Sequence, residues 1–179
     1  AGNVGADVQF SATNSFTLHA KLCRGSHINA TALSDATAAL GVVVYSHSHA
    51  AVRFNNADVQ FNVEASLHAG VFSISQKHAT AVGMALTSGA SDVSVFISGS
   101  NITFEAALAG DAAKLYAQGS INAVVLAVAL YARSSSCTTE ITTSVVTLRG
   151  RVAGHGAELR AVATAHTAAT IGWVHSSDI

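Results

Sequence analysis

The sequence predicts an all-β fold, an antiparallel sandwich or barrel of the jelly-roll type, in a single domain spanning residues 1–179. Apolar and polar residues alternate along most of the chain, as half-buried strands require. Clusters of Gly, Ser, Asn and Asp separate the alternating runs and supply turns without any proline. A length of 179 residues suits one domain, and many short strands between frequent turns favour a sandwich or barrel.

The expected strands share this alternation and are rich in Val, Ile, Phe and Thr, which favour extended backbone. In the first half of the chain they cover residues 8–12, 16–20 and 41–45, one longer run at residues 52–63, and residues 69–75 and 82–87. In the second half they cover residues 92–97, 101–108, 123–131, 138–148, 159–165 and 168–174.

Two alanine-rich stretches interrupt the strand pattern and are candidates for helices. They are ATALSDATAAL at residues 30–40 and AALAGDAAKLYAQG at residues 106–119. Alanine is the best helix former, but helices of this length are marginal on their own. These two stretches therefore leave the expected all-β class unchanged.

A repeated pentapeptide suggests a duplicated half or a repeat fold. ADVQF occurs at residues 6–10 and again at residues 57–61, while a related segment, NITF, occurs at residues 101–104 at a different spacing. A β-solenoid is built from coils of one sustained length. Because these echoes do not keep one spacing, we treat the β-solenoid as the alternative to the sandwich or barrel.

Composition excludes some classes of function. The chain has 50% hydrophobic but only 11% charged residues, and its formal net charge is −1. This balance and the absence of a basic arm argue against nucleic-acid binding. The longest apolar run, residues 123–132, is half the length that a membrane-spanning helix needs, so no membrane span is expected.

Cys23 and Cys137 are the two cysteines of the chain, so they could form one disulfide. Their spacing matches no zinc or redox motif. The sequence leaves open whether they form a bridge or two thiols. Asn29 and Asn101 begin the glycosylation patterns Asn-Ala-Thr and Asn-Ile-Thr, which matter only in a secreted protein.

His47 and His49 are the candidates for metal ligation, because residues two apart on a strand share a face. No third ligand is evident, so we expect no metal. Neither a nucleophile motif, a phosphate loop nor a pair of carboxylates with general acid and base spacing occurs in the sequence. We therefore expect no catalytic residues, no cofactor and no enzymatic activity.

The low charge and high apolar content favour a structural subunit that associates with copies of itself into a filament, tube or shell. Such a homo-oligomer is expected outside the cell or within an external or viral assembly. The alternative is a secreted ligand-binding or carbohydrate-binding β-sandwich module of the adhesin type. Aromatic residues make up only 6% of the chain, which supplies little material for a sugar site.

Overall fold

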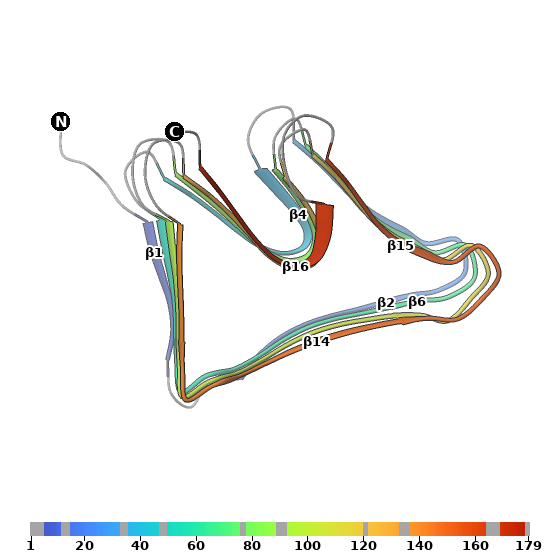
Figure 1. Ribbon diagram of the computed structural model, residues 1–179. Helices are drawn as coiled ribbons and strands as arrows, with labels where there is room; N and C mark the ends of the chain where they lie inside the picture. The colour runs from blue at the N-terminus through green and yellow to red at the C-terminus, as the bar shows by residue number, and fades with distance from the viewer. Residues whose placement is uncertain are drawn as a thin grey trace.

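The computed structural model winds the chain into four successive coils of four strands each, stacked on one another (Figure 1). It describes residues 6–11, 15–32, 36–46, 50–75, 78–88, 93–119, 122–132, 137–163 and 169–177. In the view of Figure 1 equivalent strands of the coils superpose, and the fourth strand of each coil bends in between the first and the third.

Equivalent strands have nearly the same length in every coil. The first coil comprises β1 (Ala6–Ser11), β2 (Ser15–Leu22), β3 (His27–Ala32) and β4 (Ala36–Ser46). The second comprises β5 (Ala50–Asn55), β6 (Asp58–Ala65), β7 (Gly70–Ser75) and β8 (His78–Ser88). The third comprises β9 (Val93–Ser98), β10 (Asn101–Leu108), β11 (Lys114–Gly119) and β12 (Asn122–Ala132). The fourth comprises β13 (Cys137–Thr142), β14 (Val145–Val152), β15 (Glu158–Ala163) and β16 (Ala169–Ser177).

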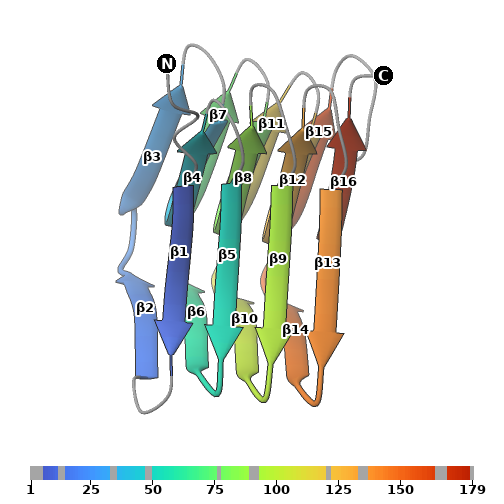
Figure 2. The same ribbon diagram turned by 90° about the vertical axis from the view of Figure 1, so that its left-hand side faces the viewer.

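Each strand pairs with its equivalents in the neighbouring coils and so builds four parallel sheets, numbered here 1 to 4 after the strand's place in the coil. Sheet 1 is β1-β5-β9-β13, which Figure 2 shows side by side, and sheet 2 is β2-β6-β10-β14. Sheet 3 is β3-β7-β11-β15, and sheet 4 is β4-β8-β12-β16.

The antiparallel sandwich or barrel expected from the sequence is therefore wrong, because every described strand pair is parallel. Parallel pairing needs a long return path, which the other three strands of each coil provide. The stack of coils is solenoid-like and is compatible with the β-solenoid alternative. The two candidate helices are also wrong: residues 30–32 and 114–119 lie in sheet 3, and residues 36–40 and 106–108 lie in sheets 4 and 2.

Alternation places one set of side chains inside the stack in every coil. In sheet 2, Val59, Phe61 and Val63 point inward and are buried, while the polar residues between them are less buried. Phe61 and Phe104 occupy the same position in adjacent coils, and their rings stack with centroids 5.1 Å apart. Similar residues thus form ladders through the core, and burial of these ladders stabilises the fold.

A tight corner joins sheets 1 and 2 and repeats in the second to fourth coils. Asn56, Gly99 and Thr143 hold this corner with positive φ angles of 51°, 57° and 46°. The Ala57 backbone N–H donates a hydrogen bond to Ser100 Oγ (3.0 Å), and the Ser100 N–H donates to Ser144 Oγ (3.0 Å). Each serine hydroxyl therefore binds the corner of the preceding coil to its own.

The bend of sheet 4 depends on small residues at one register position. Gly41, Gly83, Ala127 and Gly172 occupy this position in the four coils. Gly83 and Ala127 have φ angles of 135° and 119°, a region that favours glycine. A Cβ at Gly83 would collide with the carbonyl oxygen of Ala127, so the bend requires glycine there.

Candidate functional site

In the last coil, apolar side chains at inward-facing positions of the strands are exposed. Three of them are Ile141 (47% exposed), Leu148 (41%) and Val152 (45%). Their register partners in the third coil, Ile97, Phe104 and Leu108, are at most 1% exposed. The difference arises because no described coil packs on the far side of the fourth.

The first coil presents the opposite edges of the same sheets. In β2, Phe16, Leu18 and Ala20 are only half-buried, although their partners Val59, Phe61 and Val63 in the second coil are buried. Strand edges carry backbone N–H and C=O groups that can pair with another strand. The two ends of the stack are thus edge surfaces with an apolar interior, and they form the candidate site.

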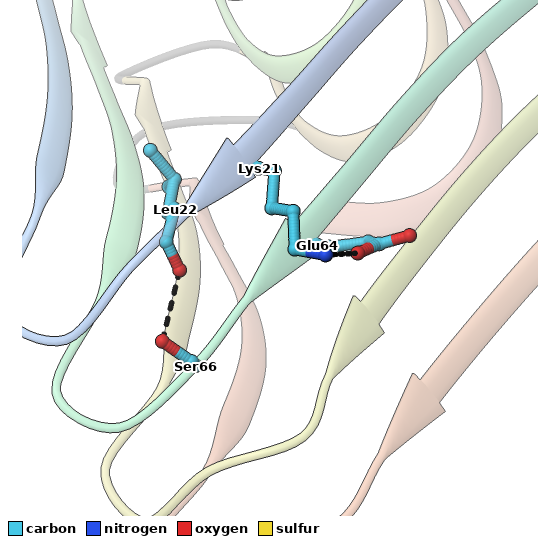
Figure 3. Close-up of polar contacts among 4 residues, drawn as sticks. All are labelled: Lys21, Leu22, Glu64 and Ser66. Carbon is cyan, nitrogen blue, oxygen red and sulfur yellow. Dashed lines mark hydrogen bonds and ion pairs between the residues drawn. The ribbon is translucent and has the colours of Figure 1, made fainter.

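The outer face shows how closely equivalent positions in adjacent coils approach. Lys21 Nζ lies 3.6 Å from Glu64 Oε2, and Lys114 Nζ lies 3.5 Å from Glu158 Oε1. Each pair occupies one register position in neighbouring strands, β2 with β6 and β11 with β15. In Figure 3 Lys21 and Glu64 point toward one another, while the Ser66 hydroxyl donates a hydrogen bond of 2.9 Å to the Leu22 carbonyl. Facing charges in adjacent coils therefore interact directly.

A depression of about 230 Å³ on the outer face of sheet 1 is a second candidate. Arg53, Phe96 and Glu140 share one register position in successive coils, and the Arg53 guanidinium lies 4.5 Å from the centroid of the Phe96 ring. Asn55 and Thr142 also line the depression. It offers a cation, an aromatic ring, a carboxylate and neutral polar groups on one surface.

A second depression, of about 300 Å³, is the third candidate and lies on the outer face where β2, β6 and β10 end. Its lining combines Lys21, Glu64 and Cys23 with the small residues Ala107 and Ala109. The depression exists because these alanine side chains are too short to fill it, and most of its surface is apolar.

Cys23 and Cys137 do not form a disulfide in the structure: Cys23 is exposed after β2, and Cys137 is half-buried at the start of β13. They lie in the first and fourth coils, three inter-strand steps or about 14 Å apart along the stack. The two Cα atoms of a disulfide lie at most about 7 Å apart. A bridge within one chain would therefore require the stack to be broken.

The two glycosylation candidates both lie on strands and are exposed. Asn29 is in the middle of β3 with Thr31 two residues on, also exposed, and Asn101 begins β10. Both residues are therefore accessible to solvent in the folded protein.

The candidate metal ligands His47 and His49 lie outside the described residues. Within the described ranges, no group of three or more His, Cys, Asp and Glu side chains is arranged to hold a metal ion.

Alternation in the sequence predicted which residues of the last coil face inward. It did not predict that they are exposed, because exposure depends on which strand pairs with which.

Comparisons with family models, with curated proteins and with solved structures found no match to this chain. The described part of the chain contains no helix with the length and apolar character needed to cross a membrane.

Proposed function

We propose that the protein is a structural subunit that associates end to end with copies of itself. The observation that carries this proposal is the exposure of Ile141, Leu148 and Val152 at the last coil, where the equivalent residues of the preceding coil are buried. A surface of this kind is stabilised by a further coil of the same shape. The first coil of a second copy has that shape and supplies the opposite strand edges.

End-to-end association of this kind joins two different surfaces, the last coil of one copy and the first coil of the next. Such a contact does not close on itself unless the subunits curve into a ring, so it extends into a filament. Parallel pairing continues across it, because all described strands of a sheet run in one direction. Among the filament, tube or shell expected from composition, a filament is thus the form we propose.

The test is the size of the particles formed by the wild-type protein and two variants. Light scattering after size-exclusion chromatography and negative-stain microscopy, at micromolar concentration, should show filaments that lengthen with concentration. Leu148→Glu places a charge in the end surface and should give monomers. The matched control is Ile74→Glu on β7, because Ile74 is 40% exposed on the outer face of the second coil, away from both ends.

The control should still form filaments, because it leaves both ends unchanged. A wild-type protein that stays monomeric at every concentration would contradict the proposal. Loss of association in Ile74→Glu with none in Leu148→Glu would also contradict it, since the contact would then be lateral. Circular dichroism of both variants checks that the coils are folded.

The depression at Phe96 favours a second function, the binding of a neutral saccharide. A sugar ring has an apolar C–H face that can pack on an aromatic ring, and hydroxyl groups that can pair with Arg53, Glu140 and Asn55. Calorimetric titration with maltohexaose and with cellohexaose tests it. Binding should be lost in Phe96→Ala and kept in Phe72→Ala, a half-buried aromatic residue of the outer face of sheet 3. Absence of heat with both sugars would reject this function.

A further inference from the structure

We propose that the contact between two copies continues the register of the coils, so that Arg151 of one copy lies beside Lys21 of the next. This inference rests on the proposed end-to-end association and specifies its geometry. It also assigns to the contact a pair of like charges that opposes association. The register follows from strand lengths, from the inward ladders and from the outer-face charges.

Strand lengths restrict how two ends can meet. The first three strands of the first and of the fourth coil have 6, 8 and 6 residues in both cases. A shift of one residue would turn the inward side chains outward. A shift of two would keep the faces but misalign both corners of the coil, where the chain changes direction. The register that aligns strands and corners together pairs Val145 with Ser15.

The inward ladders support the same register. Within the chain, Leu18, Phe61, Phe104 and Leu148 occupy one position of sheet 2. Continuing the ladder places Leu148 of one copy on Leu18 of the next, and Val152 on Leu22 by the same rule. Each contact joins two apolar side chains, as the buried ladder positions within the stack do.

On the outer face of sheet 2, the proposed register brings two like charges together. Lys21, Glu64, Ala107 and Arg151 occupy one register position from the first coil to the fourth. The next residue in this series is Lys21 of the following copy. Because Lys21 already lies within 3.6 Å of Glu64 in the adjacent strand, equivalent side chains in adjacent strands are close enough for charges to act on each other. Like charges placed directly across two strands are destabilising.

The other outer-face charges add no comparable conflict. In sheet 1, Glu140 meets the position of Gln9, and in sheet 3, Glu158 meets the position of His27. Arg149 meets the position of His19. Among the described outer-face charges of sheets 1 to 3, the pair of permanently charged groups of one sign is therefore Arg151 with Lys21.

The experiment is a double-mutant cycle on association, measured by light scattering at low salt. Arg151→Glu replaces repulsion by attraction, and Ala107 beside it in the same chain carries no charge to disturb. The dissociation constant should fall about threefold to tenfold, the range that two exposed charge pairs allow. Adding Lys21→Ala should remove most of this gain. Raising the salt concentration should tighten wild-type association and weaken that of Arg151→Glu.

The outcomes separate this inference from the proposed function. If Leu148→Glu abolishes association but Arg151→Glu has no effect, or its gain survives Lys21→Ala, the register is wrong while end-to-end association stands. If Leu148→Glu does not abolish association, the proposed function fails. A wild-type protein that never associates overturns both. We expect Arg151→Glu to keep the fold, because Arg151 is exposed. Thermal unfolding of the variant checks this.

Discussion

The rings of Phe61 and Phe104 lie almost parallel, with an interplanar angle of 5° and centroids 5.1 Å apart, although they are one full coil apart in sequence. Phe104 is completely buried between Phe61 and the last coil's Leu148. This stacked pair shows how the protein is stabilised, since each coil rests on the side chains of the next.

Phe104→Ala should lower the free energy of unfolding by about 3 to 5 kcal/mol, because it leaves a cavity between two coils. Leu148→Ala at the same register position should cost clearly less, since Leu148 is 41% exposed in the single chain. Urea unfolding under conditions where the protein is monomeric measures both. Equal losses would contradict the ladder as the source of stability.

The Ser100 hydroxyl should contribute to stability through the corner. It accepts a hydrogen bond from Ala57 N–H and donates one to the Ser98 carbonyl at 2.8 Å, and Ser100 is buried. Ser100→Ala should cost about 1 to 3 kcal/mol, because the buried Ala57 N–H would lose its partner. Ser144→Ala, at the more exposed corner of the last coil, should cost less. Thermal unfolding of the two variants gives the comparison.

The bend of sheet 4 should respond in opposite directions to two substitutions. Ala127→Gly should stabilise the protein by about 1 kcal/mol, because a φ of 119° strains a residue that has a Cβ. Gly83→Ala should destabilise it strongly, because the added Cβ meets the Ala127 carbonyl. Chemical denaturation of both variants, with CD to confirm the fold, is the measurement. Stabilisation by Gly83→Ala would show that the bend is not held as described.

Both thiols should react with a maleimide reagent in the native protein. Cys23 is exposed and should react first, while Cys137 is half-buried and should react more slowly. Mass spectrometry of the labelled chain counts the adducts over time. A chain that takes up label only after reduction would show a disulfide and would require a different arrangement of the first and fourth coils.

Alternation predicted most strands, because it reports which side chains face the interior whatever the partner strand is. The range 101–108 matches β10 at both ends. The expected run 138–148 is instead split by the corner at Thr143. Residues 30–32, 36–40 and 114–119 lie in strands although their alanines favour a helix locally, because packing between coils overrides that preference.

Strand partners could not be predicted, because the repeat conserves size and polarity more than identity. The two copies of ADVQF lie at different places in the coil, the first in β1 and the second across the start of β6. The register equivalent of residues 58–61 is NITF at residues 101–104, at a spacing that differs from that of the two ADVQF copies. The repeated pentapeptide therefore indicated a wrong repeat length. The apolar ladder of Phe16, Val59, Ile102 and Val146 shows why: its members share no single residue type.

Stacked corner positions lie 43 or 44 residues apart, so every coil uses nearly the same length of chain. One coil adds about 4.8 Å along the axis, the spacing of paired strands, and leaves the cross-section unchanged. Duplication or deletion of an internal coil would therefore change length in fixed increments without altering either end. Loss of a few residues inside a coil would instead shift every later ladder out of alignment.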